Sequence, residues 1–294
     1  MIQTNSIPIR KGILNHLKKL QDQIDALPTY KEQVKQAKVL WQNKKKTNAQ
    51  KAAFNRVEKE LQKIAIGTSN CCNYCESNLG TTIEHIYPRG LYPNKTFVWE
   101  NFLWTCKTCN GKHKISQFQI FETPLSSNTI NLVKDYTFTP PPNADAVFIN
   151  PRTENPLHYL QLDLNSGLFS PTHSDPASRA YKRAVYTLET LQLNTRKALV
   201  IKRKEAYQKY LQLIQDYALI QEATSLDELV CFQSYISIRR NYSLEALKSR
   251  LSLSIQKTLI YAPHPTVWKE MQRQATDVSL LNQLFLQIPQ VLHW

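Results

Sequence analysis

The chain has 294 residues, is 42% hydrophobic and 20% charged, and carries a formal net charge of +14. Such a length can bury the cores of one to three domains. The chain has neither the about 18 consecutive apolar residues of a membrane span nor an apolar signal segment, so we expect a cytoplasmic protein without a membrane partner. The excess of Lys and Arg favours polyanionic partners such as nucleic acids.

The positive charge is concentrated at the start of the chain. Residues 1–66 contain 14 Lys and Arg but only 5 Asp and Glu, a formal charge of +9. Apolar residues recur here every three or four positions, which predicts amphipathic helices over 12–27, 34–41 and 54–64. We therefore predict a basic N-terminal helical region over 1–66, which either contacts phosphates or presents solvated helix faces.

The apolar pattern changes after this region. Two short β-favouring stretches, 81–87 and 97–104, precede a helical stretch at 106–117, so we predict a small ββα unit within 67–121. From 122 to 294 the pattern predicts a mostly helical region with a short β-hairpin. The predicted strands of this last region cover 144–150, 160–164 and 168–170, and its predicted helices cover 180–191, 199–214, 244–253, 266–275 and 278–287. The expected fold class is α+β, mainly α.

Four of the six cysteines form two Cys-x-x-Cys pairs, namely Cys72, Cys75, Cys106 and Cys109. Two such turns supply the four thiolates of a tetrahedral structural zinc site. A ββα unit of this size has too little apolar surface to form a stable core by itself. A bound metal ion that cross-links the chain would supply the missing stability. A redox-active dithiol is the alternative interpretation of the pairs, and Cys71 and Cys231 have no assigned role.

Polar residues between and after the two pairs could form a hydrolytic centre. Hydrolysis of a phosphodiester needs a base for water, a cation for the phosphate and a group that orients the base. His85 suits the role of base because an unperturbed imidazole titrates near ~6.5. Glu84 precedes it, and the two side chains point to opposite faces if both lie within a strand. On the following helix, Asn110 shares a face with either His113 or Lys114.

The run C-x-x-C … I-E-H-I-x-P … E-N-F-L-W-T-C-x-x-C-N-x-K resembles the HNH (ββα-metal) endonuclease superfamily. The chain length, the N-terminal helices and the segment FINPRTENPLHYLQLDLNSGLF further resemble the PtuB-type nucleases of Septu and retron anti-phage systems. The resemblance implies a zinc-stapled ββα-metal nuclease unit at 67–121. It implies a prokaryotic phosphodiester hydrolase, with DNA preferred over RNA as the substrate.

The resemblance also implies a role for each polar residue of the centre. His85 would be the general base, Asn101 would orient it, and Glu84 with Asn110 would bind one catalytic Mg²⁺ or Mn²⁺. Two positions depart from the family pattern, because Glu84 stands where Asp is commoner and Asn110 where His is commoner. His113 occupies a place where Lys is commoner, and it would act as a phosphate contact or replace Asn110 as the metal ligand.

The resemblance implies partners as well: a PtuA-type ATPase, and in some systems a retron reverse transcriptase with its DNA. Three other functions stay open at this point. The chain could be an HNH effector that cleaves RNA, including tRNA, because nothing in the sequence reveals recognition of a 2′-hydroxyl. It could be a non-catalytic zinc-knuckle module that binds nucleic acid, or a thiol–disulfide protein without zinc.

Overall fold

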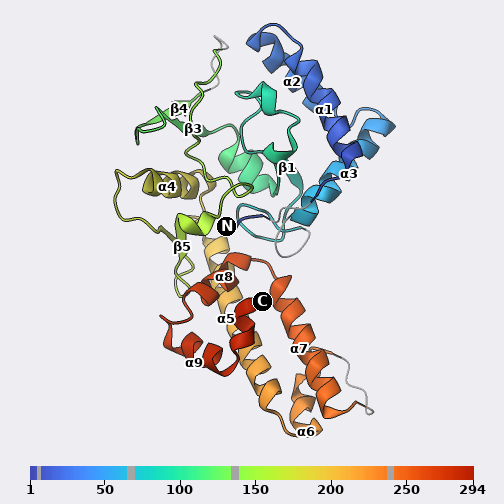
Figure 1. Ribbon diagram of the computed structural model, residues 1–294, viewed down its shortest axis with the longest axis vertical. Helices are drawn as coiled ribbons and strands as arrows, with labels where there is room; N and C mark the ends of the chain where they lie inside the picture. The colour runs from blue at the N-terminus through green and yellow to red at the C-terminus, as the bar shows by residue number, and fades with distance from the viewer. Residues whose placement is uncertain (5–7, 65–69, 134–138, 237–241) are drawn as a thin grey trace. The chain divides into compact units, whose positions relative to one another are not determined.

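The computed structural model describes the chain in five stretches: 1–4, 8–64, 70–133, 139–236 and 242–294. The chain forms two compact units (Figure 1). The first comprises Met1–Gln161 and Phe169–Arg196, and the second comprises Leu162–Leu168 and Lys197–Trp294. The first unit thus contains the basic helical region, the centre with its cysteines, and part of the region predicted to follow them.

The N-terminal region forms helices α1 (Lys11–Asp25), α2 (Tyr30–Asn43) and α3 (Asn48–Ile64), which confirms the predicted helices. The second begins with a capping box, in which the Thr29 hydroxyl accepts from the backbone N–H of Glu32 and the Glu32 carboxylate accepts from that of Thr29. Their apolar faces share one core with the central strands and the loop between them. Its buried members include Leu17, Ala37, Trp41, Phe54, Leu61, Phe97, Phe102 and Trp104.

Short antiparallel strand pairs follow. Strand β1 (Thr82–His85) pairs with β2 (Phe102–Thr105) in a register that sets His85 opposite Phe102. Strand β3 (Phe118–Phe121) pairs with β4 (Thr129–Leu132), and β5 (Leu160–Leu162) pairs with β6 (Phe169–Pro171). The pairs β1–β2 and β5–β6 confirm the strands predicted there. Together with its helices, the chain is mainly α with small antiparallel sheets, which agrees with the expected fold class.

One local prediction was correct only in part, and a second was wrong. The helix expected at 106–117 is a π-helix, Thr108–Lys114, and the chain leaves it at Ile115 to begin β3, which the sequence pattern did not predict. The strand expected at 144–150 is irregular, with one isolated bridge between Ala146 and Ile120. The second error arises because Val147, Phe148 and Ile149 are buried in irregular backbone, and a run of buried apolar residues looks in sequence like a strand.

After Pro176, every remaining α-helix except the short Leu226–Leu229 overlaps a predicted stretch. Helix α4 (Arg179–Leu191) belongs to the first unit. The second unit contains α5 (Lys197–Glu222), α6 (Leu226–Leu229), α7 (Leu244–Ile260), α8 (Pro265–Arg273) and α9 (Ser279–Gln287). Helix α5 packs against α7, α8 and α9, because it buries residues on more than one face, including Tyr210, Ile214 and Ile220. Among the described helices, none is long and apolar enough to cross a membrane.

Candidate functional site: a cysteine cluster beside a basic cavity

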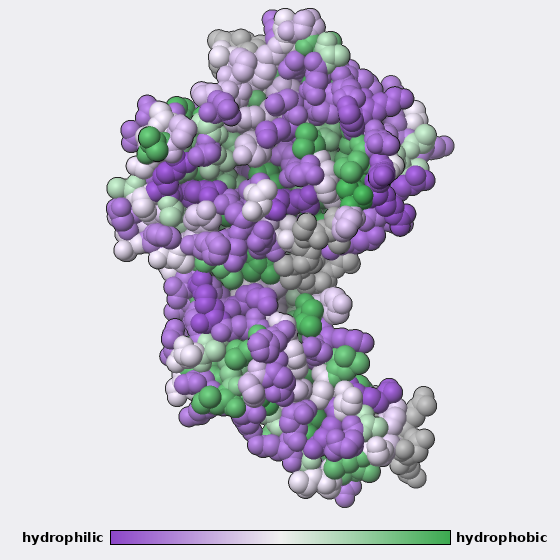
Figure 2. Space-filling model, viewed as in Figure 1, coloured by the Kyte–Doolittle hydropathy of each residue, from purple (hydrophilic) through white to green (hydrophobic). Residues whose placement is uncertain are grey.

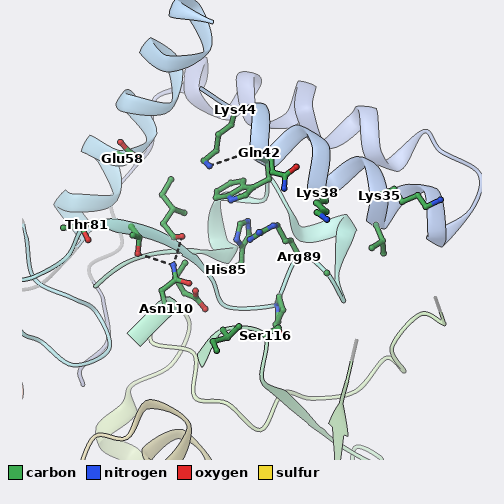
Figure 3. A pocket seen from close by; sticks show the side chains of 18 residues that line it. Lys35, Lys38, Gln42, Lys44, Glu58, Thr81, His85, Arg89, Asn110 and Ser116 are labelled. Atoms are coloured by element: carbon green, nitrogen blue, oxygen red, sulfur yellow. Dashed lines mark hydrogen bonds between the residues drawn. The ribbon is translucent and has the colours of Figure 1, made fainter. Parts of the chain in front are cut away.

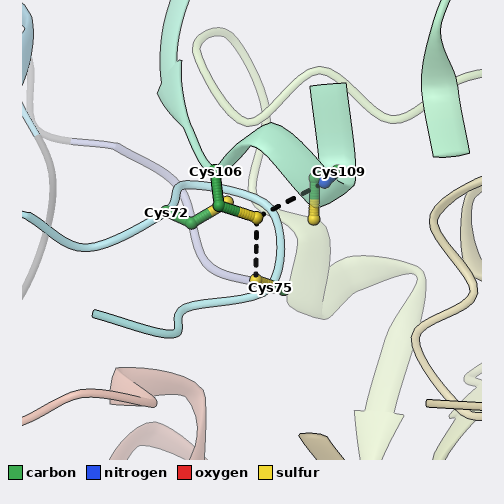
Figure 4. A group of neighbouring side chains, drawn as sticks. All are labelled: Cys72, Cys75, Cys106 and Cys109. Carbon is green, nitrogen blue, oxygen red and sulfur yellow. Dashed lines mark hydrogen bonds between the residues drawn. The ribbon is translucent and has the colours of Figure 1, made fainter. Parts of the chain in front are cut away.

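The four Cys-x-x-Cys thiols meet in one buried cluster (Figure 4). The Sγ atoms of Cys72, Cys75, Cys106 and Cys109 all lie within 4.8 Å of one another, and those of Cys75 and Cys106 are 3.8 Å apart. A zinc tetrahedron with Zn–S bonds of about 2.3 Å has S–S edges of roughly 3.8 Å. All four cysteines are free thiols. The cluster is therefore compatible with a zinc site.

Local backbone geometry builds this cluster. The first pair sits in a tight turn, closed by hydrogen bonds from the N–H of Glu76 to the carbonyl of Cys72 and from the N–H of Cys72 to the carbonyl of Ser77. The second pair follows β2, and the N–H of Cys109 donates to the Sγ of Cys106 at 3.3 Å. Hydrogen bonding within the cluster lowers the pKa of Cys75 and Cys106, whereas burial raises the pKa of Cys72 and hydrogen bonding with Cys106 raises that of Cys109. Only the first two shifts favour the thiolate that a metal requires.

Arg196 adds a contact that the sequence did not predict. Its Nη1 donates to the Sγ of Cys109 at 3.3 Å, and its side chain is half-buried. Four thiolates around Zn²⁺ carry a net charge of −2, so a guanidinium beside them offsets part of it. No spacing rule links Arg196 to Cys109, because 87 positions separate them in the chain.

Replacing Arg196 with Ala should weaken zinc retention by roughly 10- to 100-fold, the usual effect of removing a group that supports metal ligands. Competition with a chromophoric chelator measures this directly. The matched control is Lys197→Ala, because Lys197 is the exposed neighbour. Equal zinc affinity of the two variants would show that the guanidinium does not support the cluster.

A cavity of about 740 Å³ opens beside β1 in the same unit (Figure 3). It is lined by residues of α2, of β1, of the loop that follows β1, and of the π-helix. Glu84, His85 and Asn110 all line it, so the structure brings these three predicted site residues together. Asn101 and His113 are not among the lining residues.

His85 lies deep in this cavity, with its ring packed between Trp41 and Phe102 at centroid distances of 4.3 and 5.3 Å. Its Nε2 is 2.9 Å from the carbonyl oxygen of Thr96. A carbonyl only accepts hydrogen bonds, so Nε2 carries the proton and Nδ1 keeps its lone pair. Burial, followed by the charge of Arg89, lowers the pKa of His85 to about 3. The imidazole is therefore neutral, the form that a base requires.

Asn101 hydrogen-bonds to the backbone of the loop that follows β1. Its Oδ1 accepts from the N–H of Tyr87 at 2.7 Å, and its Nδ2 donates to the carbonyls of Tyr87 and Lys95 at 3.0 and 2.8 Å. The side chain thus ties the start of the loop to its end, one residue before Thr96. The direct partner of His85 is Thr96, and Asn101 supports the loop that presents this carbonyl.

Glu84 faces the other side of β1 and forms a buried ion pair. Its Oε1 is 2.6 Å from the Nζ of Lys114, with side-chain exposures of 3% and 0%. The same Nζ donates to the carbonyl of His85 at 2.9 Å. Burial raises the pKa of Glu84, and Lys114 opposes that shift. Lys114 therefore neutralises the carboxylate and holds the end of β1 against the π-helix.

Asn110 contacts the same strand. Its Nδ2 donates to the carbonyl of Ile83 at 3.0 Å and to the hydroxyl of Thr82 at 3.2 Å. Among the described residues none hydrogen-bonds to its Oδ1. The π-helix thus directs both Asn110 and Lys114 to β1. His113 is buried away from the cavity, and burial followed by the charge of Arg196 lowers its pKa.

The donor set fits a divalent cation. Mg²⁺ and Mn²⁺ prefer hard oxygen ligands, and Glu84 and Asn110, which carry a carboxylate and an amide oxygen, are both among the residues that line this cavity. A cation there would share the carboxylate with Lys114.

The wall of the cavity formed by α2 and by the loop after β1 is basic. Figure 3 shows Lys35, Lys38 and Lys44 on the α2 side, with Arg89 beside His85. The Nζ of Lys44 and the guanidinium of Arg89 lie 4.2 and 5.7 Å from the centre of the Trp41 ring. Glu58, which also lines the cavity, is paired with Lys45 at 2.7 Å. Hydrophilic residues cover most of the visible surface over α1 and α2 (Figure 2). The wall is therefore suited to an anionic ligand.

These features define a cysteine cluster compatible with zinc beside a basic cavity that holds a neutral histidine, a carboxylate and an amide. No family model matches the chain. Over 50 residues, 15% of the chain, it is 42% identical to the Septu protein PtuB of Bacillus thuringiensis. The match spans 20% of that protein, about a fifth of its length. The similarity concerns one short segment of each protein.

Proposed function

We propose that this chain is a metal-dependent HNH endonuclease that hydrolyses phosphodiester bonds in nucleic acid, with DNA as the preferred substrate. The observation that carries the proposal is the placement of His85: the Thr96 carbonyl holds its Nε2, so Nδ1 keeps its lone pair, and the residue lines a basic cavity. The partial similarity to PtuB supports a nuclease-like function.

In the proposed reaction, Nδ1 of His85 accepts a proton from water as the water oxygen bonds to phosphorus. The P–O3′ bond breaks, the departing O3′ takes a proton from solvent water, and the products carry a 5′ phosphate and a 3′ hydroxyl. A bound Mg²⁺ or Mn²⁺, held by Glu84 and Asn110, would supply positive charge to the phosphate. Lys35, Lys38 and Lys44 bind flanking phosphates, and Thr96 stabilises the ring as it becomes charged.

We further propose that the chain works with an ATPase of the PtuA type in anti-phage defence, in some systems together with a retron reverse transcriptase and its DNA. The support is the match to a Septu protein, which covers a short segment. Co-purification of an ATPase with the tagged chain is the expected result.

A non-catalytic zinc-knuckle module that binds nucleic acid is the second candidate. The ion pair between Glu84 and Lys114 favours it, because the ammonium already neutralises the carboxylate that would hold a cation. Such a module would use the basic wall and have no need of a divalent cation.

Divalent-metal dependence separates the two candidates. Purified chain, alone and with any co-purified ATPase, is incubated with plasmid, single-stranded DNA and total RNA in Mg²⁺, Mn²⁺ or EDTA. We expect cleavage, DNA before RNA, in Mg²⁺ or Mn²⁺ and none in EDTA. Binding that is equally strong in EDTA, without cleavage of any substrate, would instead identify a binding module.

A further inference from the structure

The residue that ends the π-helix has an unusual backbone conformation. Ile115 has φ 49° and ψ −102°, and the N–H of Gln117 donates to the carbonyl of Lys114 at 2.8 Å. These values describe a type II′ turn with Ile115 at its first central position, which needs positive φ and is usually Gly. A β-branched side chain is a steric outlier there. The fold therefore holds Ile115 in a strained position.

Burial does not explain why an isoleucine stands in this position. Its side chain is 58% exposed and lines the cavity that contains His85 and Asn110. The adjoining backbone is held firmly, because the N–H of Ile115 donates to the carbonyl of Asn110 at 2.8 Å and the preceding Lys114 is fixed against β1. Strained residues of this kind concentrate at functional sites.

The surroundings indicate what the side chain contacts. In Figure 3 the adjacent Ser116 lies across the cavity from Lys38 and Lys44. A strand whose phosphates follow the basic wall would turn its sugars and bases towards the Ile115 side. A stiff apolar side chain suits contact with a sugar or base and is unsuited to a phosphate.

We propose that Ile115 is an apolar wedge that inserts against the base step next to the bound phosphate. The proposal rests on the proposed function, because it assumes that the cavity binds nucleic acid. Apolar side chains that wedge between base steps unstack them, which is easiest at flexible pyrimidine–purine steps such as TA. Ile115 would therefore select deformable sequences without any hydrogen bond to a base.

The test measures base unstacking in the absence of cleavage. A His85→Gln protein is titrated with a short duplex that carries 2-aminopurine in place of adenine at its TA steps, and the fluorescence is compared with that of the same protein carrying Ile115→Gly. We expect the fluorescence to rise on binding only when Ile115 is present, and the Gly variant to bind roughly tenfold more weakly. The salt dependence of binding should stay the same, because no phosphate contact is lost.

Two controls accompany this comparison. The thermal midpoint of Ile115→Gly should not fall, because Gly adopts positive φ without strain. Leu125→Gly removes an apolar side chain that is 97% exposed and does not line the cavity, and it should leave the fluorescence change intact.

The outcomes distinguish this inference from the proposed function. An equal fluorescence rise in the proteins with and without Ile115 would overturn the wedge, whether or not the wild-type chain cleaves DNA. Loss of a co-purifying protein from Ile115→Gly, with unchanged DNA binding, would also overturn it. A rise that depends on Ile115 in a chain that cleaves nothing would support the wedge and refute the nuclease.

Discussion

Replacing His85 should lower the rate of phosphodiester cleavage by roughly 10²- to 10⁴-fold, the usual contribution of a positioned general base. The imidazole is neutral and its Nε2 is committed to the carbonyl of Thr96, so Nδ1 is the atom that can accept a proton from water. Single-turnover cleavage of a labelled duplex at saturating protein measures the effect on chemistry apart from binding.

Two variants at this position separate catalysis from folding. His85→Ala leaves a void between Trp41 and Phe102 and an unpaired carbonyl at Thr96, so part of its effect is structural. His85→Gln keeps an N–H donor and most of the volume but supplies no base. The exposed His173 serves as a control, and His173→Ala should cleave like the wild type. Wild-type rates in His85→Gln with normal zinc content would exclude the proposed mechanism.

The second large effect concerns the cysteine cluster, where Cys109→Ser should abolish zinc binding and unfold the surrounding structure. Metal binding to a structural site of four thiolates is coupled to folding and is worth on the order of 10 kcal/mol. Cys106 directly follows β2, and Cys109 precedes Asn110 within the π-helix. Loss of the metal should therefore release both the strand pair that carries His85 and the helix that carries Asn110.

Metal analysis, thermal unfolding and circular dichroism of Cys109→Ser test this expectation. Cys231→Ser is the matched control, because Cys231 is exposed and lies outside the cluster. A folded, active Cys109→Ser protein that lacks zinc would contradict a structural role for the cluster. Ejection of zinc from the wild type with a thiol-reactive mercurial, a harsher treatment than the EDTA of the cleavage assay, should reproduce the unfolding.

Much of the fold could be predicted from local spacing. The helices α1, α2 and α3 follow from apolar residues at steps of three and four, and Pro28 indicates the break between the first two. The π-helix escaped prediction because helices with i→i+5 hydrogen bonds are rare. Its consequence is large, since it turns Lys114 onto Glu84.

For the candidate site, the Cys-x-x-Cys spacing predicted the four thiols that cluster, and the family resemblance pointed to Glu84, His85 and Asn110, which line one cavity and whose roles stay predictions. Their signals are local, because metal ligands recur at fixed spacing and an acid–His pair is a contiguous motif. The partners that set their chemistry became visible only in three dimensions: Trp41 and Thr96 around His85, Lys114 on Glu84 and Arg196 on Cys109. Those contacts join residues from separate helices, loops and strands. The burial of each side chain and the charges around it depend on how the chain packs, so the spacing of residues along the sequence does not reveal them.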